Sequence, residues 1–175
     1  MRYQNLPSKF YKKNRKEFAK AMRPNSIAIL SSNDIQVTNA DDIMGFAQNN
    51  DLFYLSGIDQ EETILLLYPE AYKKENREIL FIKETNEHIK IWEGEKLTSE
   101  QASEISGISR VEWADNFEKI LQLMAFEADG FYLGHNEHIK RATNKMQTRQ
   151  DRFIKWCKEK YPLHDYFLSK SLFQD

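Results

Sequence analysis

The sequence predicts an α/β fold with a mixed β-sheet of about six strands and helices on both faces of the sheet. Short apolar runs rich in β-branched residues occur in both halves of the chain and indicate buried strands. Before Gly94 these runs are separated mainly by turns, which is typical of an antiparallel meander. After Gly94 helical and strand patterns alternate, which is typical of βα units.

The chain is expected to open with a helix and a central strand. In residues 8–22 apolar side chains recur at spacings near three and four among lysines and arginines, which predicts an amphipathic helix with Ser8 as its cap. Pro24 ends this pattern. The next run, Ser26–Ser31, is nearly continuous in apolar character, as expected of a strand covered on both faces.

A long polar excursion is predicted to follow. Residues 33–50 are polar and contain Gly45, so we expect a loop with at most a short strand near residues 35–38. Residues 52–55 and 63–68 are then read as two strands of an antiparallel hairpin.

Two further strands complete the predicted meander. A charged turn at residues 73–77 precedes a buried strand at 78–82. Residues 89–92 alternate between apolar and polar types, which predicts a half-exposed strand.

The second half is predicted to consist of βα units followed by a tail. The expected elements are a capped helix at 98–105, a strand near 111–113, a helix at 116–126, a strand at 131–134 and a long helix at 140–161. Pro162 suggests a boundary, so we expect a domain over residues 1–161 and an irregular linker that begins at 162–175.

Composition limits the function classes. The 25 lysines and arginines nearly balance 27 acidic residues, so no overall field favours nucleic acid or an anionic membrane as a partner. The single cysteine, Cys157, excludes an intrachain disulfide and a cysteine-based zinc cluster, and is expected to be a packed apolar residue. Neither a spanning apolar run nor the apolar core of a signal peptide is found, and we expect a cytoplasmic protein.

Two groups of polar residues are candidate reaction sites. His135 and His138 flank Glu137, a spacing found in zinc deaminases, but one cysteine cannot supply the rest of that metal site. A solvated loop is favoured here over a metal site or a small hydrolase that uses either histidine. The pair Glu61 and Glu62 is expected to be solvated, like most surface charges.

Trp92 stands out among the aromatic residues. It lies on the predicted half-exposed strand, beside Lys90 and before Glu93. Its ring is compatible with the core or with a rim position where aromatic groups contact partners. The residues alone leave both positions open.

Several motifs in order carry a family resemblance over residues 8–160. They are the basic opening helix, SIAIL at 26–30, Ala40-Asp41, QNNDLFYLSG at 48–57 and IWEG at 91–94. In this order and spacing the chain resembles the amino-terminal domain of Xaa-Pro aminopeptidases. One departure concerns Asp41, because members often carry an arginine shortly before the matching acid and residues 37–40 contain none.

The resemblance implies a fold similar to the creatinase and prolidase amino-terminal domains, with a ribonuclease H-like motif. In that family a separate carboxy-terminal domain binds two divalent ions, commonly manganese, and removes the amino-terminal residue that precedes proline. None of the matching metal ligands falls in this sequence, so we expect no catalysis by this chain alone and no cofactor in it.

The resemblance also implies partners and site residues. The expected partners are the chain's own catalytic domain, neighbouring subunits of a homo-oligomer and the peptide substrate. Trp92 and Asp41 are expected to contact substrate across subunits, the indole as an apolar contact and the carboxylate as a polar one. The alternative is a stand-alone protein-interaction module, because the same fold occurs in a histone chaperone subunit.

Overall fold

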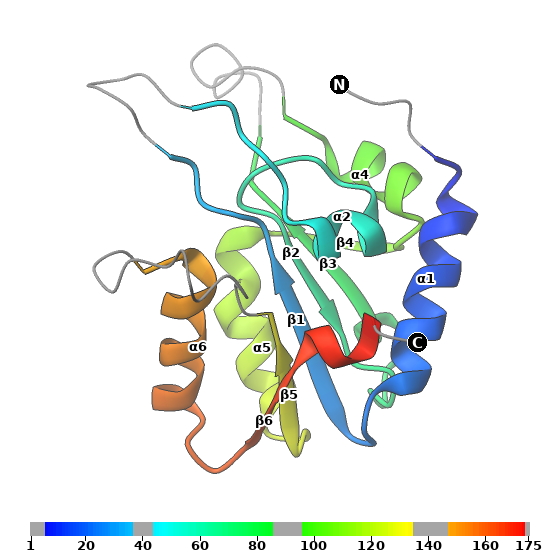
Figure 1. Cartoon of the computed structure of the whole chain (residues 1–175). Helices are drawn as coiled ribbons and strands as arrows, with labels where there is room; N and C mark the ends of the chain where they lie inside the picture. Colours follow the sequence, from blue (N-terminus) through cyan, green and yellow to red (C-terminus); the bar gives the residue numbers. More distant parts are fainter. Residues whose placement is uncertain (1–5, 37–43, 86–95, 135–146, 174–175) are drawn as a thin grey trace.

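The structure is a computed structural model that describes residues 6–36, 44–85, 96–134 and 147–173. Within these ranges six strands form one sheet in the order β4-β3-β2-β1-β5-β6 (Figure 1). The strands are β1 Ser26–Ser31, β2 Ile64–Leu67, β3 Glu78–Ile82, β4 Arg110–Trp113, β5 Gly130–Leu133 and β6 Asp165–Leu168. The helices are α1 Ser8–Ala21, α2 Asn50–Ser56, α4 Ser99–Ser106, α5 Phe117–Ala125 and α6 Arg149–Lys160, with 3-10 turns η1 Lys74–Asn76, η2 Ala114–Asn116 and η3 Ser169–Phe173.

The sheet is mixed, as predicted. β2 pairs antiparallel with both β1 and β3, so β1 and β3 run in the same direction. β5 is parallel to β1, β6 to β5 and β4 to β3. The predicted α/β class and the central position of β1 are therefore confirmed.

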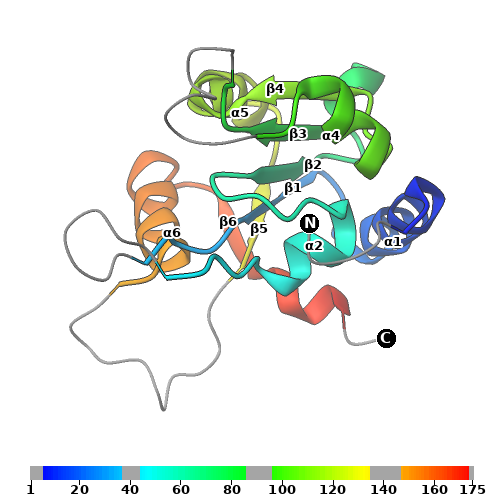
Figure 2. The same ribbon diagram turned by 90° about the horizontal axis from the view of Figure 1, so that it is seen from above.

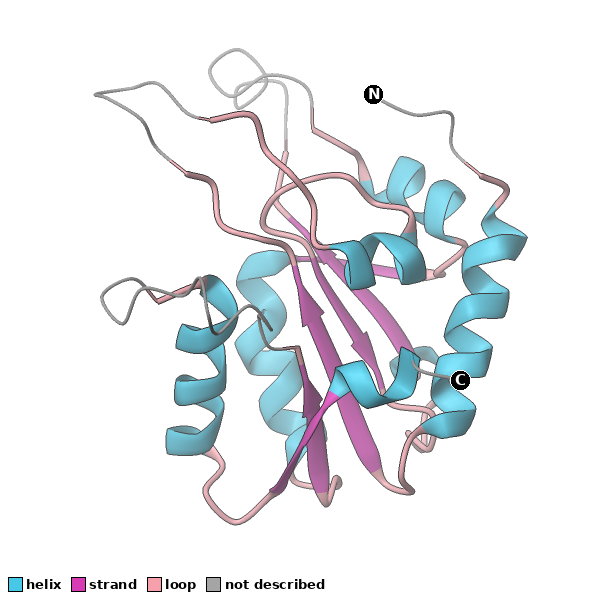
Figure 3. Cartoon of the chain, in the orientation of Figure 1, coloured by secondary structure: helices cyan, strands magenta, loops and turns pink. Residues whose placement is uncertain are grey.

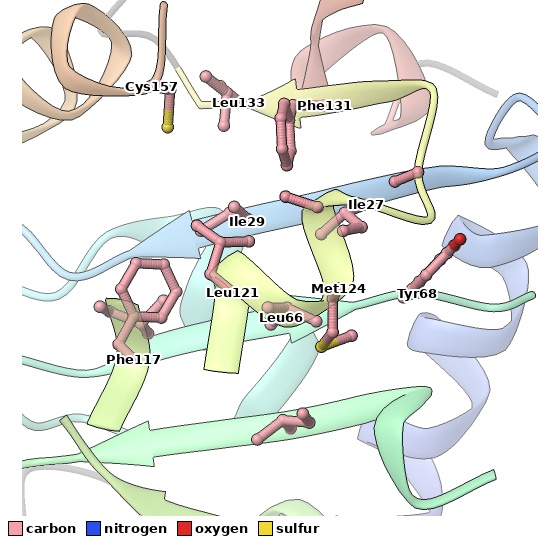
Figure 4. Packing of buried hydrophobic residues seen from close by; sticks show 14 of the residues in the cluster. Ile27, Ile29, Leu66, Tyr68, Phe117, Leu121, Met124, Phe131, Leu133 and Cys157 are labelled. Atoms are coloured by element: carbon pink, nitrogen blue, oxygen red, sulfur yellow. The ribbon is translucent and has the colours of Figure 1, made fainter. Parts of the chain in front are cut away.

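Helices cover both faces of the sheet (Figures 2 and 3). Side chains alternate along a strand, so Ile27 and Ile29 of β1 pack on one face and Ala28 and Leu30 on the other. The first face lies under α5 and α6, and Figure 4 shows its core. The second face lies under α1, α2 and α4.

Cys157 belongs to the core on the α5 and α6 face, as predicted (Figure 4). Its side chain is fully buried. Burial raises the pKa of the thiol to about 12, because the thiolate would have to form in apolar surroundings. The residue therefore acts as a packed apolar group at ordinary pH.

The expected strand at residues 52–55 is wrong, because this segment lies in helix α2. The Asn49 side chain caps the helix by accepting hydrogen bonds from the backbone N–H groups of Asp51 and Leu52, at 3.0 and 3.1 Å. Gly57 ends it in the left-handed conformation, with φ of +72°. The hairpin predicted for residues 52–68 is therefore wrong as well.

The expected irregular conformation after residue 161 is also wrong, because β6 extends the sheet beside β5. The backbone N–H of Asp165 donates to the carbonyl oxygen of Asp129 at 3.0 Å. The Tyr166 hydroxyl lies 2.8 Å from the carbonyl oxygens of Cys157 and Tyr161, at the end of α6. These contacts hold the segment on the domain, and its role as the start of a linker stays a prediction.

Three helix boundaries can be compared with the predictions. Ser8 is the first residue of α1 and does not cap it, because Pro7 occupies the cap position. The predicted cap of α4 is confirmed, since Thr98 forms a capping box with Gln101. Residues 147 and 148 precede α6, so the helix predicted from residue 140 begins at Arg149.

Two predicted strands fall partly or wholly outside the described residues. These are the strand at 89–92 and the second half of the one near 35–38. In the described part of the chain no helix is long and apolar enough to cross a membrane.

Candidate functional site

The predicted site residues Asp41 and Trp92 lie outside the described residues, as do His135 and His138. The fold nevertheless fixes where their segments begin. β1, β3 and β5 run in the same direction, so their carboxyl ends meet at one edge of the sheet, which we call the carboxyl edge (Figure 1). The segments 37–43, 86–95 and 135–146 follow these three strands in that order.

A turn over residues 58–62, which we call the anchor turn, lies at this edge between α2 and β2. Its two glutamates pair with lysines on either side of segment 86–95. Glu61 pairs with Lys96, and each side chain is only 15% exposed. Glu62 lies 3.6 Å from the Lys83 ammonium and is 40% exposed. Both sides of the segment that carries Trp92 are therefore tied to one turn.

The prediction that Glu61 is solvated is wrong, whereas Glu62 is partly exposed. Burial raises the pKa of the Glu61 carboxyl, but the hydrogen bond and positive charge of Lys96 outweigh it and hold the pKa below its ordinary value of 4.5. Glu61 is therefore ionised at neutral pH and acts as a structural partner of Lys96.

Gln60 connects the anchor turn with the two neighbouring loops. Its side-chain oxygen accepts a hydrogen bond from the backbone N–H of Leu97 at 2.8 Å. Its carbonyl oxygen accepts one from the Gln48 side chain, also at 2.8 Å, and Gln48 donates to the carbonyl of Ile58 at 3.1 Å. The chain before α2 and the chain before α4 thus meet on Gln60.

The residues that flank segment 37–43 are hydrogen-bonded to each other. The backbone N–H of Met44 donates to the carbonyl oxygen of Gln36 at 2.8 Å, and the Asn33 side chain donates to that of Ala47 at 3.0 Å. Together with Gln48, these contacts place the flanks of the segment that contains Asp41 beside the anchor turn.

The start of α6 closes the same edge on the other side. The Asp34 carboxylate accepts a hydrogen bond from the backbone N–H of Arg149 at 2.8 Å and pairs with the Arg152 guanidinium at 2.6 Å. A hollow of about 300 Å³ lies between the loops and α6, lined by Asn33, Asp34, Gln36, Met44, Gly45, Phe46, Ala47, Thr148 and Gln150. Its described lining is part polar and part apolar.

Metal chemistry is not supported by the described residues. Over residues 6–36, 44–85, 96–134 and 147–173, no three His, Cys, Asp or Glu side chains come close enough together to hold an ion. The described donor set therefore does not fit a metal cofactor, and no reaction step is assigned to one in this part of the chain.

Sequence reasoning missed the anchoring residues Gln48, Gln60 and Lys96. Their partners lie 10 to 37 residues away in the chain, and no local pattern marks such pairs. The roles expected of Trp92 and Asp41 stay predictions, because both residues lie outside the described ranges.

Comparison with known proteins gives a match to a family model. Residues 11–132 match the family described as "Aminopeptidase P, N-terminal domain". The Xaa-Pro aminopeptidase of Escherichia coli K12 is 23% identical over 143 residues, which cover 78% of this chain and 32% of that protein. Intermediate cleaving peptidase 55 of Saccharomyces cerevisiae is 39% identical over 57 residues, 33% of this chain and 11% of the yeast protein.

Solved structures are similar over nearly the whole chain. A Bacillus anthracis structure assigned to aminopeptidase P superposes with a TM-score of 0.83 and 28% identity, covering 93% of this chain and 38% of that one. Aminopeptidase PepP of Pseudomonas aeruginosa gives 0.75 and 23%, covering 98% and 38%. The 175 residues thus span about a third of the length of these relatives.

Proposed function

We propose that this chain is the accessory domain of a metal-dependent Xaa-Pro aminopeptidase, because it belongs to the family of aminopeptidase P N-terminal domains. Such an enzyme removes the amino-terminal residue that precedes proline. The observation that carries the proposal is the unequal coverage, because the B. anthracis match takes in 93% of this chain but 38% of the longer protein. The remaining length of such a protein is where we place the catalytic domain.

The domain's role in this proposal is to contact neighbouring subunits of a homo-oligomer and to narrow the entrance to their active site. Trp92 and Asp41 supply the apolar and the polar contact with the peptide substrate. The anchor turn supports this assignment, because it binds the flanks of the two segments that carry them. A fixed loop base reduces the entropy lost when a loop orders against a partner.

Metal ions belong to the catalytic domain in this proposal. One related structure is a zinc-substituted E. coli aminopeptidase P in complex with product. We place two divalent ions, manganese by resemblance to the family, in the catalytic domain of the full-length protein. We place the protein itself in the cytoplasm. This chain then contributes shape and contacts, and the activated water lies elsewhere.

The proposal is tested in the full-length enzyme that contains these residues. Trp92→Ala and Asp41→Asn are expected to raise KM for an Xaa-Pro peptide by about tenfold, with a smaller effect on kcat, because they remove substrate contacts that do not take part in the reaction. Tyr72→Ala is the matched aromatic control, because Tyr72 is 91% exposed and lies between β2 and β3 at the opposite edge of the sheet. Equal effects of Trp92→Ala and Tyr72→Ala would contradict the assignment of Trp92.

A second assay addresses the accessory role itself. The 175-residue chain, supplied with manganese, is expected to give no turnover of the same peptide. Turnover by this chain would overturn the accessory role. If the full-length protein that contains these residues had no peptidase activity, the stand-alone protein-interaction module would be favoured instead.

A further inference from the structure

A second pocket of about 300 Å³ lies between α5 and α6, on the face of the sheet shown in Figure 4. Ile29 of β1 and Ile64 of β2 line it from the sheet. Phe117 from α5 and Phe153 and Trp156 from α6 line its sides. An engineered apolar cavity of about 150 Å³ is enough to bind benzene, so this volume is sufficient for a larger planar ring.

The aromatic walls are held in place by one another. The rings of Phe153 and Trp156 are stacked, with centroids 5.6 Å apart and planes inclined by 19°. The ring centroid of Phe117 lies 5.8 Å from that of Phe153. A planar ring that enters between α5 and α6 would therefore meet aromatic side chains that already support one another.

The charged residues that line the pocket differ in whether they have an ion-pair partner. Arg152 pairs with Asp34 at 2.6 Å, and Glu118 pairs with Lys160 at 3.4 Å. Arg149 also lines the pocket, and in the described part of the chain its guanidinium pairs with no carboxylate. Of the three charged residues that line the pocket, Arg149 is thus the one without an ion-pair partner among the described residues.

We propose that this pocket binds a small aromatic carboxylate, with its ring between the aromatic side chains and its carboxylate on Arg149. Pockets for small ligands commonly combine an apolar lining with a few placed polar groups, as here. A guanidinium binds a carboxylate through two parallel hydrogen bonds, which an uncharged ligand cannot match. The proposed function does not require this site.

The test compares two ligands of the same shape by calorimetric titration of the 175-residue chain at low salt. 2-Naphthoate is expected to bind with a Kd on the order of 0.1 to 1 mM, as its size allows. Its uncharged isostere 2-naphthamide is expected to bind about tenfold more weakly, because it lacks the ion pair. Equal affinity for the two ligands, or no binding of naphthoate, would overturn the proposal.

Variants locate the site. Arg149→Gln is expected to remove the preference for naphthoate, whereas Lys155→Gln keeps it, because Lys155 lies on the same helix, is 69% exposed and does not line the pocket. Phe153→Leu is expected to weaken the binding of both ligands about equally. Unfolding curves show whether each variant is folded. If Arg149→Gln left the tenfold preference intact, the carboxylate would not lie on Arg149 and the proposal would fail.

Discussion

Arg15 Nη1 donates a hydrogen bond of 2.8 Å to the carbonyl oxygen of Leu55. The same nitrogen donates to the carbonyl oxygen of Ser106 at 3.0 Å, and Nη2 forms an ion pair of 3.1 Å with Glu78. The Arg15 side chain is fully buried. A cation from α1 thus satisfies carbonyl groups near the carboxyl ends of α2 and α4, where a positive charge is also favoured by the helix dipoles.

Replacing Arg15 is expected to be among the most damaging changes on this face. Arg15→Met keeps the apolar stem but leaves two buried carbonyl groups and Glu78 without their partner. The free energy of unfolding, measured in urea, should therefore fall by about 2 to 4 kcal/mol. Lys16→Met is the control, because Lys16 is exposed on the same helix. Similar urea midpoints for the two variants would show that the buried contacts contribute little.

The two glycines that end α2 and α4 are expected to differ in their tolerance of alanine. Both have φ near +70°, which costs a side chain about 1 kcal/mol. A Cβ on Gly57 would also lie 2.4 Å from the buried ring of Tyr11, whereas one on Gly107 would meet the flexible end of Lys12. We expect Gly57→Ala to cost about 2 to 4 kcal/mol in urea unfolding and Gly107→Ala about 1 kcal/mol. An equal cost would mean that Tyr11 moves aside freely.

The pair of Glu61 and Lys96 is expected to make stability depend on pH. The pKa of Glu61 is lower in the folded chain than its ordinary value of 4.5. The stabilisation is therefore fully present above that value and is lost as the pH falls through the folded pKa. Glu61→Gln should lower the free energy of unfolding by about 1 to 2 kcal/mol at pH 7 and reduce the loss between pH 5 and pH 3.

The control for Glu61 is Glu17, which forms an exposed pair with Lys20. Glu17→Gln should leave the urea midpoint at pH 7 unchanged, because exposed pairs contribute little. If Glu61→Gln retained the full wild-type loss of stability in acid, another carboxylate would be responsible.

The Cys157 thiol is expected to resist modification in the folded chain. Its pKa of about 12 leaves almost no thiolate at pH 8, and its side chain is fully buried. A disulfide reagent such as 5,5′-dithiobis(2-nitrobenzoate) should react at least about 100-fold more slowly with the native chain than with the chain in guanidinium chloride. Comparable rates would indicate that α6 opens readily.

The raised pKa of the Cys157 thiol also affects stability. The contribution of the buried neutral thiol to the free energy of unfolding should decline as the pH rises from about 9 toward 12.

Much of the fold is predictable from local patterns, and the exceptions have physical causes. β1 and β3 are apolar runs buried on both faces, and such runs are distinctive. The LFYL run at residues 52–55 has strand-like composition, but Asn49 and Gly57 cap a helix around it, and the caps together with packing of Leu52 and Leu55 decide the conformation. β6 was missed because four residues after a proline give little signal, and its stability comes from pairing with β5.

The site was less predictable than the fold. Nothing around Arg15 in the sequence indicates burial, because its hydrogen-bond partners lie 40 and 91 residues away. Lys96 meets Glu61 across 35 residues in the same way. Such contacts depend on the assembled sheet, so motif order could identify the family while the anchoring residues came only from the structure.

The last turn of the domain, η3, brings Phe173 to within 5.0 Å of Phe18 near the start of the chain, measured between ring centroids. β6 likewise adds to the half of the sheet in which β5 pairs with β1. During synthesis on a ribosome, the apolar side of α1 is therefore not fully covered until residues 169–173 have emerged. Until then the nascent chain exposes apolar surface of the kind that chaperones cover.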